Sequence, residues 1–336
     1  MDSRTRPTAV IPVAGVGSRL RPHTHTVPKV LIQVAGKPML AHILDELLAL
    51  EIRDVVLVVG YLGDRIRHFV DRCYGDSFTV TYVEQPEREG LGHAIHLTRD
   101  AVDPARPLLI VLGDTIFRAD FGGVIASEIS LIGVREVDDP RRFGIVETDD
   151  RGRVSKLVEK PEQPTSNLAI VGIYYIVRPA ELYDALDELI DSGRRSQGEY
   201  QLTDALGSLV ATGHALGVFT VEDWFDCGKP ETLLETNRAL LDLKGDAAPD
   251  GHRTSIIIPP VAIAESATVL NSILGPHATV AAGAVIRNSI VRNAIINDSA
   301  IVEDVMLDAS VVGDHAFVRG SYKKLNVGDS SEVELV

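Results

Sequence analysis

A six-residue period in the last third of the chain limits its fold more than any other sequence feature. From about residue 256, hexapeptide units begin with an aliphatic residue and carry a small residue at the fifth place, as in 263–268 (IAESAT), 280–285 (VAAGAV) and 296–301 (INDSAI). Such a repeat predicts a parallel β-helix with three short strands per turn, in which the aliphatic residue points inward. We expect asparagines near the corners, because asparagine tolerates left-handed backbone; they are Asn271, Asn288, Asn293 and Asn297.

The preceding part of the chain follows a different pattern. Apolar runs suited to buried strands, at 9–13, 54–59 and 108–112, alternate with stretches of helical spacing at 39–50 and 63–73. This alternation predicts a mostly parallel sheet with helices on both faces. Ligands of such sheets bind beyond the carboxyl ends of the strands.

A polar stretch with glycine and proline, 244–251, separates the two patterns. A length of 336 residues is enough for two moderate domains. We therefore expect an α/β domain over 1–240, a linker over 241–254 and a β-helix domain over 255–336.

Composition excludes several classes of protein. The formal net charge of −15 disfavours nucleic acid as a partner, because an acidic chain repels phosphate backbones. Two cysteines, Cys73 and Cys227, cannot build a disulfide framework or a four-ligand zinc site, which fits a reducing compartment. The longest apolar runs, such as 55–60, are far below the roughly 20 residues of a membrane span. We expect a cytoplasmic protein without a membrane partner.

A glycine-rich segment, 14–22 (AGVGSRLRP), follows the first expected strand. Glycines there let backbone N–H groups approach phosphates closely, and Arg19 and Lys29 add cations that can neutralise a triphosphate. A dinucleotide fingerprint would need a third glycine where Leu20 stands, and a Walker loop would need Gly-Lys-Ser/Thr. The segment therefore predicts a different kind of nucleotide site.

At these residues the chain resembles the sugar-1-phosphate nucleotidylyltransferases, the NDP-sugar pyrophosphorylases. The resemblance continues in order through QP (85–86) with GLGHA (90–94), LGD (112–114), FGIV (143–146), EKP (159–161), 167–174, GEYQLTD (198–204) and WFDCG (224–228). It is nearest to thymidylyltransferase-like members acting on glucose 1-phosphate. It implies a Rossmann-like, mostly parallel sheet domain of the nucleotide-diphospho-sugar transferase type, followed by a left-handed parallel β-helix of hexapeptide repeats.

The resemblance also implies roles for individual residues. Nucleotide-binding residues would be Ala14, Gly15, Gly17, Ser18, Gln85 and Gly90. Sugar-binding residues would be Gly144, Glu159, Asn167, Gly172 and Glu199. Catalytic cations would be Arg19, Lys29 and Lys160, and metal ligands Asp114 and Asp226.

Elementary chemistry agrees with several of these roles. Asp114 and Asp226 each follow an expected strand, and two carboxylates are a usual way to hold Mg²⁺ beside substrate phosphates. The Gln85 amide can donate to and accept from a base edge. Lys160 can clamp the phosphate of the sugar. No nucleophile–base pair is visible, so we expect direct in-line attack of the sugar phosphate on the α-phosphorus.

The expected activity is formation of an NDP-sugar and pyrophosphate from a nucleoside triphosphate and a sugar 1-phosphate, with dTTP or UTP and glucose 1-phosphate first. GTP with mannose 1-phosphate is the alternative, because the segments around 28–31 and 36–39 also resemble guanylyl-transferring members. A hexapeptide-repeat acyltransferase is more remote, since His277 and His315 would have to meet across subunits. A non-catalytic sensor of NDP-sugars would be expected to lack these cations and carboxylates. We expect a homo-oligomer that associates through the β-helix.

Overall fold

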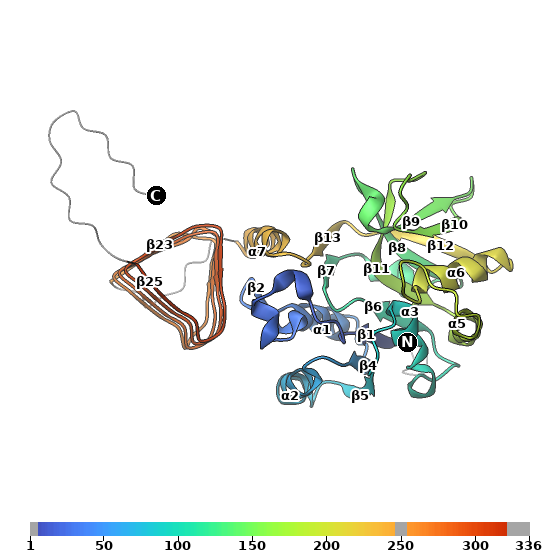
Figure 1. Cartoon of the computed structure of the whole chain (residues 1–336), viewed down its shortest axis with the longest axis horizontal. Coiled ribbons are helices and arrows are strands. Elements are labelled where there is room, and N and C mark those ends of the chain that lie inside the picture. The colour runs from blue at the N-terminus through green and yellow to red at the C-terminus, as the bar shows by residue number, and fades with distance from the viewer. Residues whose placement is uncertain (1–5, 246–253, 321–336) are drawn as a thin grey trace. The chain divides into compact units, whose positions relative to one another are not determined.

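The computed structural model describes residues 6–245 and 254–320. Contacts divide the chain into two compact units (Figure 1). The first, here called the sheet unit, comprises Met1–Ile32 and Lys37–Thr236. The second, the β-helix unit, comprises Gln33–Gly36 and Asn237–Val336.

The sheet unit is built on a mixed sheet whose central path runs β10-β9-β11-β6-β1-β4-β5. The four strands β6, β1, β4 and β5 are parallel, and β11 runs antiparallel to β6. The strands are β1 (Thr8–Pro12), β4 (Asp54–Val59), β5 (Thr79–Glu84), β6 (Leu108–Val111), β8 (Ser130–Glu136), β9 (Gly144–Thr148), β10 (Val154–Glu159), β11 (Leu168–Ile176) and β12 (Leu216–Thr220). Two short ladders join β7 (Thr115–Arg118) to β13 (Asp223–Asp226) and β2 (Gln33–Val34) to β3 (Lys37–Pro38).

Helices cover both faces of this sheet, as the alternating pattern predicts. Side chains of a strand alternate between faces, so Val10 joins one buried apolar cluster whereas Ala9 and Ile11 join another. The first cluster takes residues from α3, α5 and α6, and the second from α1, α2 and α4. The helices are α1 (Met39–Ala49), α2 (Gly63–Tyr74), α3 (Leu91–His96), α4 (Phe121–Ile125), α5 (Pro179–Asp191), α6 (Leu202–Ala211) and α7 (Pro230–Lys244), with 3₁₀ turns at Ser18–Leu20, His23–His25, Lys29–Leu31, Arg99–Ala101 and Pro140–Arg142.

The carboxyl-terminal repeats form three parallel sheets of four strands each within the described residues, which Figure 1 shows as a triangular coil. The predicted fold class is confirmed. The first sheet holds β14 (Ile256–Ile257), β17 (Ile273–Leu274), β20 (Ile290–Val291) and β23 (Met306–Leu307). The second holds β15 (Val261–Ile263), β18 (Ala278–Val280), β21 (Ala294–Ile296) and β24 (Ser310–Val312). The third holds β16 (Thr268–Leu270), β19 (Val285–Arg287), β22 (Ile301–Glu303) and β25 (Phe317–Arg319).

The corners of the β-helix explain its asparagines. Asn271, Asn288 and Asn293 have φ values of 49°, 48° and 45°, so three of the four expected left-handed asparagines are confirmed. The Asn271 amide donates to Asn288 at 3.4 Å, and Asn288 donates to the Asp304 carboxylate at 3.0 Å. Asn297 also lies in a turn, between β21 and β22, but its φ is not left-handed; it is buried and donates its side-chain amide to the Val312 carbonyl at 2.7 Å.

The β-helix unit includes residues that precede its first strand in the sequence, namely part of α7 and Gln33–Gly36. Helix α7 continues through Lys244 into the expected linker 241–254, of which residues 246–253 lie outside the described residues. Asn237 of α7 is fully buried and accepts hydrogen bonds from the Ala35 N–H at 2.8 Å and the Thr279 hydroxyl at 2.6 Å. This amide explains why Gln33–Gly36 belongs with the carboxyl-terminal residues.

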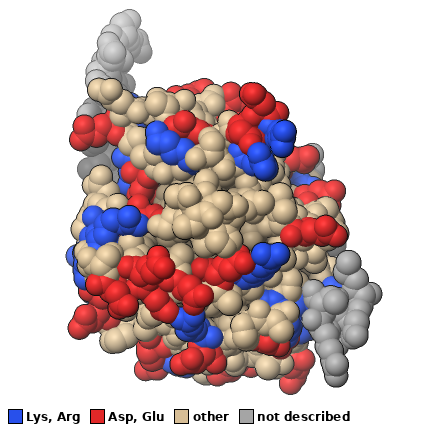
Figure 2. Space-filling view, turned by 90° about the vertical axis from the view of Figure 1, so that its right-hand side faces the viewer, with Lys and Arg blue, Asp and Glu red and all other residues tan. Residues whose placement is uncertain are grey.

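The excess of acidic over basic residues in the sequence is visible on the surface. Figure 2 shows one face of the molecule on which acidic side chains gather beside an uncharged area. In the ranges 6–245 and 254–320, no helix is both long enough and apolar enough to cross a membrane.

Candidate active site

The carboxyl ends of β1, β4, β5 and β6 lie at one edge of the sheet because these strands are parallel. Ala14 follows β1, Gly60 follows β4, Gln85 follows β5 and Asp114 follows β6. A Cβ atom on Gly60 would lie 3.0 Å from Cβ of Ala14 and 3.1 Å from the Gln85 carbonyl oxygen. The sheet therefore brings the expected phosphate loop and the expected base-reading residue together.

The glycine-rich segment turns tightly and leaves polar groups exposed. Gly17 has φ 65°, and a Cβ there would lie 2.8 Å from Cβ of Lys29. The Thr24 hydroxyl donates to the Gly17 carbonyl at 2.9 Å and fixes the turn. Gly15, Ser18 and Arg19 are exposed, so their polar groups are accessible to a ligand.

Lys29 and Asp114 form the central ion pair of this edge. The Lys29 ammonium donates to Oδ2 of Asp114 at 2.5 Å, and the Lys29 side chain is only 10% exposed. Burial alone would raise the pKa of Asp114, but the charges of Lys29 and Arg19 outweigh it and hold that pKa below its ordinary value. The carboxylate is therefore ionised at neutral pH.

Asp226 and Arg19 extend this ion pair into a four-membered charge cluster. Strand β13 pairs with β7 so that Asp226 lies opposite Thr115, the residue after Asp114. A Cβ atom on Gly228 would lie 2.9 Å from an Asp226 carboxylate oxygen and 3.0 Å from a guanidinium nitrogen of Arg19. Glycine at 228 leaves room for both groups. The sequence motif 224–228 includes this glycine but does not show why it is needed.

Cys227 lies beside the charge cluster but does not supply a nucleophile. It is fully buried, and its Sγ lies 3.6 Å from the Thr236 hydroxyl. Burial raises the pKa of the Cys227 thiol to about 12, so the neutral thiol persists at physiological pH.

A second group of residues surrounds Gln85. Its side-chain Nε2 donates to the Gly90 carbonyl at 3.2 Å, and the residue is 6% exposed. Gly90 has φ 113°, and a Cβ there would lie 2.6 Å from the Tyr200 carbonyl oxygen. The Gly92 N–H donates to that same oxygen at 2.8 Å. The 90–92 backbone thus packs directly on the chain at Tyr200.

A third group contains most of the expected sugar contacts. Gly144 and Glu159 are register partners in β9 and β10. The Glu159 carboxylate accepts from the Thr203 hydroxyl at 2.8 Å and pairs with the Lys160 ammonium at 3.2 Å. Lys160 remains 45% exposed, so its ammonium can still reach a ligand. Thr203 was not among the expected site residues, although it lies inside the motif 198–204.

The other expected sugar contacts, Gly172, Asn167 and Glu199, have different partners. The Gly172 carbonyl accepts from the Leu112 N–H at 2.9 Å, and a Cβ on Gly172 would lie 2.6 Å from a Leu112 methyl carbon. Gly172 therefore supports the chain just before Asp114. Asn167 is exposed and donates to Glu136 at 2.6 Å, and Glu199 is exposed and accepts from Gln201 at 3.3 Å.

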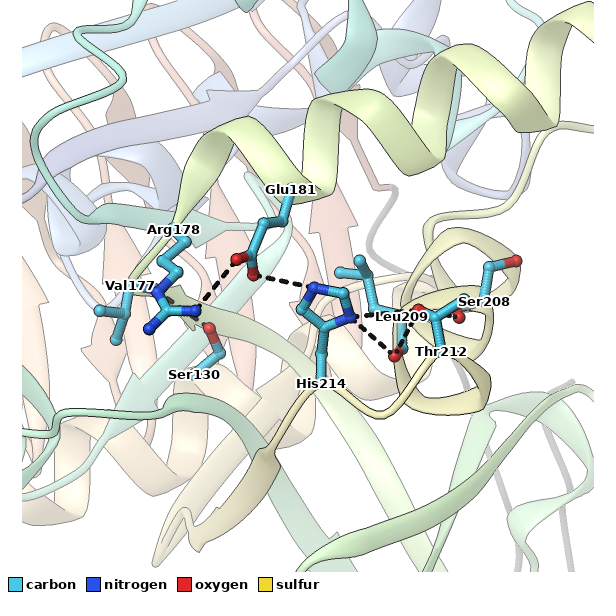
Figure 3. A network of polar contacts seen from close by, with 8 residues as sticks. All are labelled: Ser130, Val177, Arg178, Glu181, Ser208, Leu209, Thr212 and His214. Atoms are coloured by element: carbon cyan, nitrogen blue, oxygen red, sulfur yellow. Dashed lines mark hydrogen bonds and ion pairs between the residues drawn. The ribbon is translucent and has the colours of Figure 1, made fainter.

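A cavity of about 200 Å³ lies elsewhere in the sheet unit, beside the first residues of β8 and the last of β11. Its polar side chains contact one another: Figure 3 shows Glu181 between Arg178, at 3.1 Å, and His214, at 3.3 Å. Because β11 runs antiparallel to β6, this end of β11 lies at the amino end of β6. The cavity is thus at the opposite edge of the sheet from Asp114.

Comparisons with known proteins identify the family. A family model described as Nucleotidyl transferase matches residues 8–242. "Low-salt glycan biosynthesis nucleotidyltransferase Agl11" of Haloferax volcanii is 32% identical, with 96% of this chain and 98% of that protein covered. A "Glucose-1-phosphate thymidylyltransferase" of Streptomyces griseus is 30% identical, with 97% and 99% covered. "UTP--glucose-1-phosphate uridylyltransferase AglF" of Haloferax volcanii is 35% identical, with 69% and 96% covered.

Among solved structures, a UDP-glucose pyrophosphorylase complexed with UDP-glucose matches with a TM-score of 0.62 and 22% identity, covering 71% of this chain and 100% of that chain. That likeness concerns the fold alone. The chain belongs to the nucleotidyl transferase family. The expected family and the expected enzyme class, a sugar-1-phosphate nucleotidyltransferase, are confirmed.

Proposed function

We propose that this enzyme forms an NDP-glucose and pyrophosphate from glucose 1-phosphate and either UTP or dTTP. The cluster of Arg19, Lys29, Asp114 and Asp226 carries the proposal. Two cations beside two carboxylates, next to a glycine-rich turn, suit a triphosphate better than any uncharged ligand. Relatives with uridylyl- and thymidylyltransferase names support this choice of base and sugar.

The proposed chemistry needs no covalent intermediate. An oxygen of the sugar phosphate attacks the α-phosphorus in line, the bond from that phosphorus to the bridging oxygen breaks, and pyrophosphate leaves. Arg19 and Lys29 neutralise charge on the triphosphate, and backbone N–H groups of Ala14, Gly15, Gly17 and Ser18 hold it. Lys160 holds the attacking phosphate.

Asp114 and Asp226 would hold Mg²⁺. The fit rests on two carboxylates brought together by the pairing of β13 with β7, of which Asp114 accepts from Lys29 through Oδ2. No group of three or more candidate ligands occurs in the described part of the chain, and Mg²⁺ needs only one or two carboxylates beside substrate phosphates. Bound there, the ion would neutralise charge on the reacting phosphates.

The sugar would lie against Gly144 and Glu159. A Cβ on Gly144 would lie 3.0 Å from a Glu159 carboxylate oxygen, so glycine keeps space open in front of that carboxylate. Glu159 can accept hydrogen bonds from sugar hydroxyls. Contacts of Asn167, Gly172 and Glu199 with the sugar stay predictions.

A substrate panel tests the proposal. Five nucleoside triphosphates are combined with glucose, mannose and galactose 1-phosphates, and pyrophosphate release is measured with Mg²⁺ and with excess EDTA. We expect the highest kcat/KM for UTP or dTTP with glucose 1-phosphate, and loss of activity in EDTA. Preference for GTP with mannose 1-phosphate would support the alternative. Consumption of acetyl-CoA without pyrophosphate release would overturn the class of reaction.

We further propose a cytoplasmic homo-oligomer. Cys73 and Cys227 are both free thiols, which fits a reducing compartment. Strands β14, β17, β20 and β23 place Ile256, Ile273, Ile290 and Met306 in register, and Met306 is 75% exposed. This apolar column fits the same face of a second copy. Light scattering should show that Met306→Lys lowers the association state, and an unchanged state would contradict this interface.

A further inference from the structure

The hydrogen-bonding sense of Gln85 is fixed by its surroundings. Its Nε2 lies 3.2 Å from the Gly90 carbonyl oxygen and 3.4 Å from Nδ1 of His93. A carbonyl oxygen can only accept, so the side of the amide that faces Gly90 must be the NH₂ group.

The same geometry fixes the tautomer of His93. The Gln85 NH₂ group has two hydrogens, one for Gly90 and one for Nδ1 of His93, so Nδ1 must be the unprotonated acceptor. The ring proton is then on Nε2, which faces Oε2 of Glu89 at 3.8 Å. The His93 side chain is 13% exposed, so solvent provides little alternative hydrogen bonding.

Charged and backbone groups hold Glu89 opposite His93. The hydrogen bond from Arg195 lowers the pKa of Glu89, which therefore stays ionised. The Arg195 guanidinium lies 4.3 Å from the centre of the Tyr200 ring. The Tyr200 N–H donates to the Glu89 carbonyl at 2.7 Å. Glu89 thus lies between His93 and Arg195.

We propose that His93 is a positioning residue that makes Gln85 present only its carbonyl oxygen to the base, so that the enzyme selects bases with an imide N–H. This inference rests on the proposed function, in which Gln85 reads the base. With both amide hydrogens engaged, Oε1 remains as the acceptor, and no hydrogen bond to it occurs among the described residues. Uracil and thymine offer N3–H to such an acceptor, whereas N3 of cytosine carries a lone pair.

Removal of His93 should weaken this selection. Without the acceptor at Nδ1, the amide keeps only the Gly90 carbonyl as an orienting partner. It can then turn its NH₂ group toward the N3 lone pair of cytosine. In the wild type, cytosine would leave Oε1 of Gln85 buried without a hydrogen bond, which penalises its binding. An amide that can turn no longer imposes this penalty.

The test is the ratio of kcat/KM for UTP or dTTP to that for CTP, measured by pyrophosphate release with glucose 1-phosphate. We expect His93→Ala to lower this ratio about tenfold, a typical effect of one recognition hydrogen bond. His93→Asn should keep the ratio, because its Oδ1 can accept near the place of Nδ1. His93→Leu fills the space without an acceptor and replaces the alanine variant if that variant does not fold.

His96→Ala is the matched control, because His96 lies on the same helix and pairs with Asp187 at 3.0 Å. It should leave the ratio unchanged. A merely structural role of His93 would lower kcat/KM for all three triphosphates equally, and that equal loss would overturn the inference. A wild-type preference for CTP would overturn it too. Absence of pyrophosphate release with every triphosphate would instead reject the proposed function.

Discussion

The two units use left-handed backbone for different purposes. Around the candidate active site it occurs at Lys160, with φ 41°, and at three glycines with no room for a side chain: a Cβ on Gly17, Gly90 or Gly172 would lie 2.6–2.8 Å from a neighbouring atom. At the corners of the β-helix it occurs at Asn271 and Asn288, whose side chains form a ladder. In the first region the missing side chain matters because chains must approach closely. At these two corners a side chain fits, and it adds hydrogen bonds to the left-handed conformation.

The sheet unit also holds the charge cluster, whereas the β-helix corners hold no catalytic group. We therefore expect changes at the charge cluster to affect catalysis most. Lys29→Met should lower kcat by about 10²–10³, because one preorganised charge at the reacting phosphates is removed. Lys37→Met is the control, since Lys37 pairs with Asp45 instead. Pyrophosphate release measures the activity, and thermal unfolding shows whether the variant folds. Equal activity of the two variants would remove Lys29 from the site.

At Gly90, the effect of the close contact with Tyr200 can be measured separately from the effect of the positive φ. Gly90→Ala should cost about 1–3 kcal/mol of stability through backbone strain, and contact with Tyr200 should also lower kcat/KM for the triphosphate. Gly193→Ala has φ 67° but no neighbour within 4 Å, so it should cost about 1–2 kcal/mol and leave kcat/KM unchanged. If both variants keep full activity, the packing of 90–92 on Tyr200 has no role in nucleotide binding.

Sequence reasoning succeeded where the structure depends on a local pattern. The hexapeptide period specifies the β-helix, because each coil repeats the same inward and corner positions. It could not tell which residue of a turn adopts the left-handed conformation: in the turn after β21 it is Ser299, with φ 56°, and not Asn297, whose amide donates to the next coil.

The contacts within the site are harder to predict from sequence. Lys29 and Asp114 are 85 residues apart, and Glu159 and Thr203 are 44 apart, so their pairing depends on the arrangement of separate strands. The motifs predicted that these regions matter. They could not predict that Gly228 leaves space for Arg19 and Asp226, or that His93 orients Gln85, because both are consequences of tertiary packing.

A corner of the β-helix should affect stability without affecting catalysis. Asn288→Ala places a Cβ-bearing residue without a polar side chain at φ 48° and removes the hydrogen bond to Asp304, so it should cost about 1–2 kcal/mol. Asn288→Gly should cost less, because glycine adopts this conformation freely. Denaturant unfolding measures both, and kcat should be unchanged. A larger loss for glycine than for alanine would show that the ladder outweighs the conformation.

The smallest expected effect is a pH dependence that belongs to the β-helix alone. Glu303 lies between Arg319 and Arg287, whose N–H groups donate at 3.1 and 3.0 Å, and these hydrogen bonds lower the pKa of Glu303 from its ordinary 4.5. Because the folded-state pKa is the lower one, this contribution to stability is present above pH 4.5 and is lost as the pH falls through the folded-state value. The difference in melting temperature between wild type and Glu303→Gln should therefore be largest near neutral pH, small because the arginines are exposed, and reduced by salt. A difference that grows as the pH falls would show that Glu303 stabilises the coil through its protonated form, and a change in kcat would show that the two units are not energetically separate.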